Sequence, residues 1–570
     1  MTSDTSRTVR YGWFLLFIAG LGGLLYGIDV GVIAAALLYL NKTINLTVEQ
    51  TSIIVAAVLG GGMFSSLVAG VLADWFGRKK MMIVSGLMFV ASVGLIVTSQ
   101  GFAALVTGRL LQGMSGGVIA VVVPLYLAEC LSADKRGRGT AIFQFMLTFG
   151  IVVAALTGWY YTRGAEAAIA AAAGNPALTL AAENHAWRGM FLSVVYPGVI
   201  FFLGAFVLSE SPRWLVRRGK TAEALAALRR ATSEEEAQLE MREMEALAQQ
   251  NVDQVAAKST GSLLQRKYVI PFVLACIILA FNQATGINSV LGYLVIILKQ
   301  AGMTASHATQ GDVAVKVLNC VMTIVAVALV DRKGRKFLLK MGTGGIVIAL
   351  ALGGFVFLSF EAKRVDVKSN IAAAVHDDTI NLPLANANLE SAPGDGPMAL
   401  TVLYSYGGGD HVATVLSSDP DPVLRIAPDA SGTSAVATRS HLRIERALYG
   451  QVPSESTGWL VAGCLGLFIA AYSAGPGVVV WLALSELMPT RIRSSGMGIA
   501  LLLNQGVSTL IAAVFLPVVG HFGFYAMFLF WSACTVIYFV TAAFFLPETK
   551  NKTLEEIEMY FEKRGEAVLS

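Results

Sequence analysis

Charge is scarce in this chain. Asp, Glu, Lys and Arg make up 14% of its 570 residues, whereas apolar residues make up 55%. The surface of a soluble protein carries charge on about a quarter to a third of its residues. A large soluble enzyme is therefore excluded, and no nucleic-acid partner is expected because a broad basic surface is missing.

Cysteine and catalytic motifs are lacking too. The five cysteines show no C-x-x-C spacing, and the six histidines are scattered along the chain. This pattern predicts neither a disulfide framework nor a metal or redox site. The sequence also contains no nucleophile elbow and no phosphate-binding loop. We therefore expect no enzyme activity, no cofactor and no metal.

What the chain has instead is long apolar runs. A helix needs about 20 residues to cross roughly 30 Å of hydrocarbon. Runs of this kind occur near 11–40, 52–73, 81–100, 103–128, 139–162, 189–208, 269–298, 313–330, 337–360, 457–485, 496–519 and 522–546. The sequence therefore predicts an all-α membrane protein with twelve transmembrane helices. The alternative, buried core helices of a soluble protein, lacks the polar surface it would need.

The distribution of Lys and Arg predicts the orientation in the membrane. These residues gather in the short loops at 74–80, 130–138, 331–340 and 487–495. Short loops rich in Lys and Arg stay on the cytoplasmic side. The polar stretch at the N-terminus precedes a run too long for a cleavable signal peptide. We therefore expect both termini in the cytoplasm of a multi-pass protein of the plasma (inner) membrane.

Two charged motifs occur twice in the chain. Asp74-x-x-Gly77-Arg78-Lys79 recurs as Asp331-x-x-Gly334-Arg335-Lys336, and Glu129 with Arg136 recurs as Glu486 with Arg493. The chain is therefore a tandem duplication, which places a substrate between the halves. The second pair is offset by about 100 residues more than the first, so an insertion separates the two motifs in the second half.

The repeat and the insertion divide the chain. The expected units are an N-terminal six-helix bundle (1–208), cytoplasmic linker helices (209–268), a C-terminal bundle (269–360 and 456–548), an outer insertion between helices 9 and 10 (361–455) and a cytoplasmic tail (549–570). Alternating stretches at Leu400–Tyr406 and His411–Leu416 favour a small β-rich module in the insertion. A partly disordered loop is an equal alternative, and a solvated linker is the alternative to the linker helices.

The duplicated charges lie at helix ends, where an Arg can pair with a carboxylate on a neighbouring helix. We expect them to form two cytoplasmic latches that hold while the substrate site faces outward. The latch residues are Asp74, Arg78, Glu129, Arg136, Asp331, Arg335, Glu486 and Arg493. For any one of them, the simpler interpretation is an ordinary topology charge.

The motifs together identify a family resemblance. They are GGLLYGIDVGVI at 22–33, GRKK at 77–80, GRLLQGMSGG at 108–117, PLYLAE at 124–129, KRG at 135–137, SESPRWL at 209–215, NQATGIN at 282–288, DRKGRK at 331–336, GPGVVVWLALSELMP at 475–489 and LPETK at 546–550. The chain resembles a sugar porter of the major facilitator superfamily from about residue 11 to 560, except in the insertion. The resemblance implies two six-helix halves and a secondary transporter.

Two charges lie deep within predicted spans, Asp29 and Arg109, while Lys316 and Lys340 are expected to snorkel to an interface. A charge at the centre of a membrane costs at least about 2.5–3.5 kcal/mol, so each should find a partner. In proton-coupled sugar porters the matching aspartate and arginine are the proton site and its partner. The resemblance therefore implies symport. A permanently ionised structural pair is the alternative.

A sugar site needs neutral amides, which both donate and accept hydrogen bonds, and an aromatic platform. The candidates, at positions that match the sugar contacts of the family, are Gln144, Asn282, Gln283, Asn288, Asn319, Asn504 and Trp481. Gly286 indicates a helix break beside them. The chain departs from the family at Asn282, Gly292 and Gln505, which favours a roomier, more polar pocket for a hexose or inositol.

The sequence therefore predicts a secondary active transporter that imports a monosaccharide or related polyol with protons by alternating access, as a monomer in the bilayer. An uncoupled facilitator, a porter for a non-sugar polyol and a non-transporting sugar sensor remain as alternatives.

Overall fold

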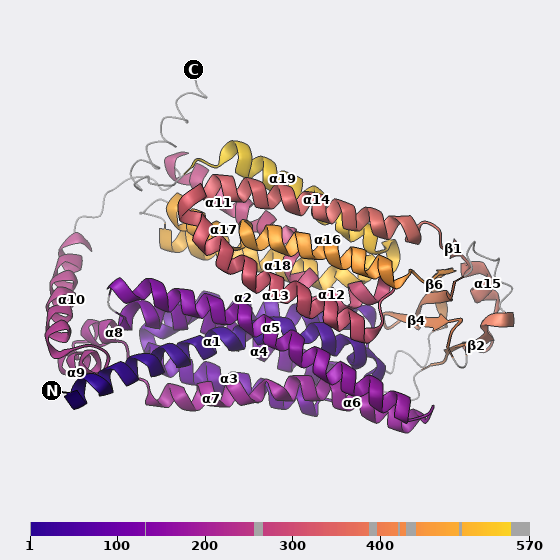
Figure 1. The fold of residues 1–570 in the computed structure, drawn as a ribbon, viewed down its shortest axis with the longest axis horizontal. Helices are drawn as coiled ribbons and strands as arrows, with labels where there is room; N and C mark the ends of the chain where they lie inside the picture. The colour runs from indigo at the N-terminus through magenta and orange to yellow at the C-terminus, as the bar shows by residue number, and fades with distance from the viewer. Residues whose placement is uncertain are drawn as a thin grey trace, which may run out of the picture.

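The protein is an elongated helical bundle with a small β-structure at one end. The computed structural model describes residues 2–131, 133–255, 266–386, 396–419, 422–428, 441–488 and 493–548. Twelve helices in these ranges are long and apolar enough to cross a membrane, which confirms the predicted spans. We call the end that carries the β-structure the insertion end, and the opposite end, near both termini, the terminus end (Figure 1).

The N-terminal half contains the first six spans. They are α1 (Thr2–Thr43), α2 (Val48–Phe76), α3 (Arg78–Thr98), α4 (Phe102–Cys130), α5 (Ala133–Ala171), and α6 (Pro176–Ser193) with α7 (Val195–Val207) as the sixth. At the terminus end follow the linker helices α8 (Pro212–Arg217), α9 (Thr221–Ala231) and α10 (Glu234–Val255) (Figure 1).

The C-terminal half repeats the pattern with two broken spans. The seventh span combines α11 (Arg266–Ala284) with α12 (Ile287–Gln300), and the tenth combines α16 (Glu455–Ala474) with α17 (Pro476–Leu487). The remaining spans are α13 (Ala305–Lys333), α14 (Arg335–Glu361), α18 (Arg493–Phe522) and α19 (Phe524–Val540), which continues as a π-helical turn to Phe545. The halves meet through α2 and α18, α5 and α13, and α1 and α12.

Glycines on α1 bring it close to α5. A Cβ on Gly23 or Gly27 would overlap the carbonyl oxygens of Phe143 or Leu147. Small residues at i and i+4 let two helix backbones approach, which gains dispersion contacts without a hydrophobic driving force in lipid. This packing fixes the face of α1 that carries Asp29.

The segment after α14 forms a β-rich module. Strands β1 (Val365–Asp366), β6 (Arg443–Gln451), β3 (Met398–Ser405) and β4 (Asp410–Leu416) form one sheet in that order, and β2 (Ile380–Pro383) pairs with β5 (Val423–Ile426). Short helix α15 (Lys368–Ala373) packs beside β6. Leu400, Val402 and Ile444 are buried in a core of the module's own, because alternate residues of each strand face it.

Candidate functional site

Asp29 and Arg109 form an ion pair inside the N-terminal half. Asp29 lies on α1 and Arg109 on α4, and Arg109 Nη1 donates to Asp29 Oδ1 at 3.2 Å. Both residues are fully buried. The same nitrogen donates to Gln112 Oε1 at 2.8 Å, and the guanidinium lies 5.6 Å from the Phe191 ring centroid. The structure therefore brings together the two charges that the sequence singles out.

One oxygen of this pair remains open to chemistry. Asp29 Oδ2 is buried and makes no hydrogen bond within the part of the chain that the structure describes. A buried carboxylate oxygen without a partner is costly, and adding a proton to the group removes that cost. The site can therefore hold either a carboxylate or a carboxylic acid.

Four predicted amides lie in the C-terminal half around a break in the seventh span. Gln283 Nε2 donates to Asn504 Oδ1 at 3.3 Å, and Asn288 Nδ2 donates to Gln283 Oε1 at 3.0 Å. Asn288 also reaches Ser508 Oγ at 2.8 Å. Nearby, Asn282 Nδ2 donates to the Tyr472 hydroxyl at 3.2 Å. Alternating donors and acceptors of this kind match the hydroxyls of a sugar.

Gly286 places these amides at the end of a helix. It lies between α11 and α12 with φ +82°, in the left-handed region that favours glycine. A Cβ there would also overlap the Trp531 ring. The helix therefore breaks where the sequence indicates, and Gln283 and Asn288 project from its two segments.

The other candidates lie apart from this network. Asn319, on α13, accepts a 2.6 Å hydrogen bond from Ser473 Oγ. Gln144 is exposed on α5, one turn before Thr148, whose hydroxyl contacts Cys320 Sγ on α13 at 3.6 Å. Trp481 lies on α17, and its side chain lies outside the part that the structure describes.

The structure corrects the expectation for Lys316. The eighth span begins at Ala305, so Lys316 lies well inside it and is fully buried rather than extended toward an interface. Its Nζ donates to Asp312 Oδ2 at 2.8 Å and to the Gly31 carbonyl oxygen on α1 at 3.2 Å. Asp312, equally buried, belongs to this second intramembrane pair and was missed because it precedes the apolar run expected at 313–330.

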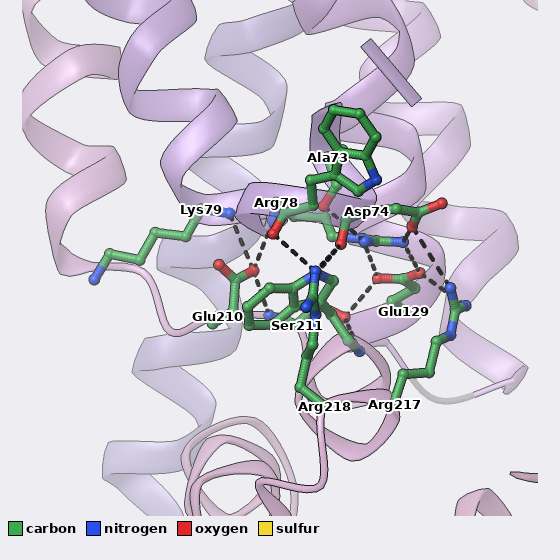
Figure 2. A network of polar contacts seen from close by, with 11 residues as sticks. Ala73, Asp74, Arg78, Lys79, Glu129, Glu210, Ser211, Arg217 and Arg218 are labelled. Carbon is green, nitrogen blue, oxygen red and sulfur yellow. Dashed lines mark hydrogen bonds and ion pairs between the residues drawn. The ribbon is translucent and has the colours of Figure 1, made fainter. Parts of the chain in front are cut away.

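Three predicted latch residues meet at the terminus end of the N-terminal half (Figure 2). Arg78 Nη2 lies 2.8 Å from Glu129 Oε1 and 2.9 Å from Asp74 Oδ1. Arg78 also donates to the Ala73 carbonyl oxygen at 2.9 Å, at the end of α2. These contacts join α2, α3 and α4 within one half. The side chain of Arg136 lies outside the described residues.

Glu210 and Ser211 complete the same cluster (Figure 2). Glu210 Oε1 accepts hydrogen bonds from the backbone N–H groups of Arg78, at 2.8 Å, and Lys79, at 3.1 Å. Ser211 Oγ donates to Glu129 Oε2 at 2.5 Å. A carboxylate at the start of α3 satisfies its open N–H groups and opposes its dipole. The sequence signal was the SESPRWL motif, which by itself indicates no partner.

The C-terminal half repeats this arrangement. Glu548 accepts from the backbone N–H groups of Arg335, at 3.0 Å, and Lys336, at 3.1 Å. Glu210 and Glu548 therefore have equivalent roles at the end of each half. The side chains of Asp331, Glu486 and Arg493 lie outside the described residues, so the second latch stays a prediction.

We expect Gly77→Ala to destabilise the protein by about 1–3 kcal/mol, because alanine is strained at this backbone conformation. Gly77 has φ +96°, and a Cβ would overlap the Glu210 carboxylate. Thermal unfolding of purified protein measures the effect. The control is Gly70→Ala, where a Cβ meets open space in a helix, and a gain of about 0.5–1 kcal/mol is expected. Equal shifts for both variants would contradict the assigned cap.

Two six-helix halves that meet around buried amides define a secondary transporter of the major facilitator class. Residues 15–376 and 445–561 match the family described as "Sugar (and other) transporter". The chain belongs to this family, whose members are membrane transporters and not enzymes. The unmatched gap falls within the β-rich module.

Named relatives cover almost the whole chain. The glucose transporter GlcP of Staphylococcus epidermidis is 28% identical, over 97% of this chain and 98% of its own. A proton myo-inositol cotransporter of Caenorhabditis elegans is 27% identical, over 98% of this chain and 91% of its own. The inward-open xylose transporter XylE of Escherichia coli superposes with a TM-score of 0.66 at 21% identity, over 96% of this chain and 98% of its own, which supports the fold alone.

Proposed function

We propose that this protein imports a monosaccharide or related polyol together with protons, by alternating access, across the plasma membrane. Both termini are then cytoplasmic, and the terminus end is the inner end. The observation that carries the proposal is the buried Asp29–Arg109 pair with its open carboxylate oxygen. Names of relatives that cotransport protons with myo-inositol or transport glucose agree with it.

The pair provides a two-state element. While Asp29 is ionised, Arg109 holds α1 against α4. A protonated Asp29 no longer attracts the guanidinium by charge, and Arg109 keeps its bond to Gln112. α1 can then move relative to α4 without leaving an unpaired anion in the membrane. Because α1 also contacts α12 of the other half, its movement bears on how the halves meet.

The amide network provides the substrate contacts. Gln283, Asn288 and Asn504 are neutral and buried or half-buried, so a sugar can exchange their mutual hydrogen bonds for bonds to its own hydroxyls. The latches then act at the inner end: we propose that they hold the inner ends of the helices together while the substrate site faces outward.

A counterflow screen in proteoliposomes tests the proposal. D-glucose, D-xylose and myo-inositol are offered as labelled substrates, and proton uptake is recorded when each is added. We expect exchange of at least one of them, with proton uptake. Exchange without proton uptake would identify an uncoupled facilitator, and binding without exchange would identify a sensor.

We expect Gln283→Ala to raise the apparent KM for the transported sugar about five- to hundredfold, because unpaired hydroxyls and amides cost about 1–3 kcal/mol. Gln283 bonds both Asn504 and Asn288, so its loss disturbs the whole network. Initial rates of uptake measure the effect. The control, Gln238→Ala, removes an exposed glutamine on α10 and should leave KM unchanged. An unaltered KM in Gln283→Ala would place the substrate elsewhere.

A further inference from the structure

A cavity of about 430 Å³ lies at the insertion end, between the β-rich module and the helix ends. Three parts of the chain line it. The N-terminal half contributes Asn41 and Thr51, the C-terminal half contributes Gln300, and the module contributes Thr401, Tyr404 and Arg446. We call this cavity the vestibule. Its size falls in the range of small-molecule sites, about 300–1,000 Å³.

The module is held to both halves around the vestibule. The backbone N–H of Asp410 donates to Glu49 Oε2, on α2, at 3.2 Å. On the other side, Arg446 Nη1 donates to the Gly520 carbonyl oxygen, on α18, at 3.0 Å, and His521 Nε2 lies 3.0 Å from Asp410 Oδ2. The vestibule therefore lies over the line where the two halves meet at this end.

The turn before β4 permits the contact with α2. Gly409 has φ +128°, and a Cβ there would come within 3.1 Å of Thr47 and Glu49. The turn therefore approaches the start of α2 with its bare backbone. The module follows α14 and precedes α16, so it belongs covalently to the C-terminal half, and this turn is what reaches the other half.

The lining matches a neutral ligand rich in hydroxyl groups. Asn41 and Gln300 supply amides, Thr401 supplies a hydroxyl, and Tyr404 supplies an aromatic face, stacked on His411 with ring centroids 5.6 Å apart. These are the group types that a sugar needs.

The charges of the vestibule offset one another. Glu361 lies within electrostatic range of both Arg364 and Arg446 and also accepts hydrogen bonds from the backbone N–H groups of Phe524 and Tyr525. An anionic ligand would have to compete with Glu361 for these arginines. A neutral ligand does not.

We propose that the vestibule is a second sugar-binding site, which captures a monosaccharide or polyol on its way to the central amides. This inference rests on the proposed function, because it takes the same class of substrate. A capture site on the entry route raises the occupancy of the route at low substrate concentration and has little effect once the central site is saturated. The vestibule therefore acts on KM and not on kcat.

The first test is uptake kinetics of the full-length protein in proteoliposomes, with D-glucose, D-xylose and myo-inositol as substrates. Tyr404→Ala removes the aromatic face, and Thr401→Val removes a hydroxyl while keeping the size of the side chain. The control, Tyr449→Ala, lies on the same sheet but outside the cavity lining. We expect KM to rise about three- to tenfold in both vestibule variants, with kcat unchanged, and no change in the control.

The second test separates the two sites. In the double variant Gln283→Ala/Asn504→Ala the central network is lost, and saturation-transfer NMR should still detect weak binding of the transported sugar. Adding Tyr404→Ala or Thr401→Val should abolish this signal. If wild type transports sugar but KM and the residual signal do not respond to Thr401→Val and Tyr404→Ala, the vestibule is not a sugar site. If wild type transports none of the three sugars and binds none at the central amides, the proposed function itself fails.

Discussion

Asp29→Asn should abolish proton-driven accumulation of sugar while leaving counterflow exchange intact. Asparagine keeps the size of the side chain and can still accept a hydrogen bond from Arg109, but it cannot release or take up a proton at neutral pH. The amide network lies in the other half and keeps its contacts. The variant should therefore bind and exchange sugar without moving protons.

The expected loss is large. One proton crossing a potential of about 150 mV releases roughly 3.5 kcal/mol, at about 2.3 kcal/mol per 100 mV. That energy supports accumulation of a neutral sugar by a few hundredfold, at about 1.4 kcal/mol per tenfold. In Asp29→Asn the ratio of inside to outside sugar should fall to about one, the value without any driving force.

The measurement compares uptake under an imposed proton gradient and membrane potential with exchange at zero gradient, in the same proteoliposomes. The control is Asp366→Asn, at the start of the β-rich module, where Asp366 Oδ1 only accepts a hydrogen bond from the Lys368 N–H. It should accumulate sugar as wild type does. Accumulation at the wild-type level by Asp29→Asn would show that the proton binds elsewhere.

The spans and the central ion pair were predictable because they depend on local sequence. Length and hydropathy define a membrane helix, and the 100° step of a helix turns Asp29 away from the Gly23 and Gly27 face that packs on α5. An aspartate and an arginine deep in the membrane have few alternatives to pairing. The structure brings Asp29 and Arg109 together for that reason.

What escaped prediction depends on contacts between distant segments. Glu210 caps a helix that begins 132 residues earlier in the chain, and nothing in its own motif indicates which helix. The contact of the Gly409 turn with α2 depends on how the module folds and docks. Hydropathy likewise ends a span at the first charge, so Asp312 was placed outside the membrane although it lies within α13.

The Asp312–Lys316 pair leads to the second prediction with a large expected effect. Removing one partner leaves the other as an uncompensated buried charge, which costs about 3–5 kcal/mol. We therefore expect Asp312→Asn and Lys316→Met each to destabilise the protein by that amount. Replacing both residues by apolar ones, in Asp312→Leu/Lys316→Met, removes the charge altogether and should restore stability to the wild-type level or above it.

Chemical or thermal unfolding of the four proteins in detergent measures this double-mutant cycle. The matched control is Lys340→Met, the other lysine that the sequence predicts to snorkel, whose side chain is exposed. Its effect should stay within about 0.5 kcal/mol. The comparison isolates burial, because both substitutions delete the same ammonium group from a membrane helix.

The cycle also separates stability from the contact between halves. Lys316 donates to the Gly31 carbonyl oxygen, two residues beyond Asp29 on α1, so the apolar double variant loses a bond that joins α13 to the helix of the proton site. If this bond helps to hold the insertion end closed, the double variant should regain stability and yet show greater accessibility of that end to a thiol reagent, at a cysteine introduced at exposed Asn41 in a background without the native cysteines. Single variants as stable as Lys340→Met would mean that Lys316 reaches water after all, and would return it to the snorkelling position that hydropathy alone assigns.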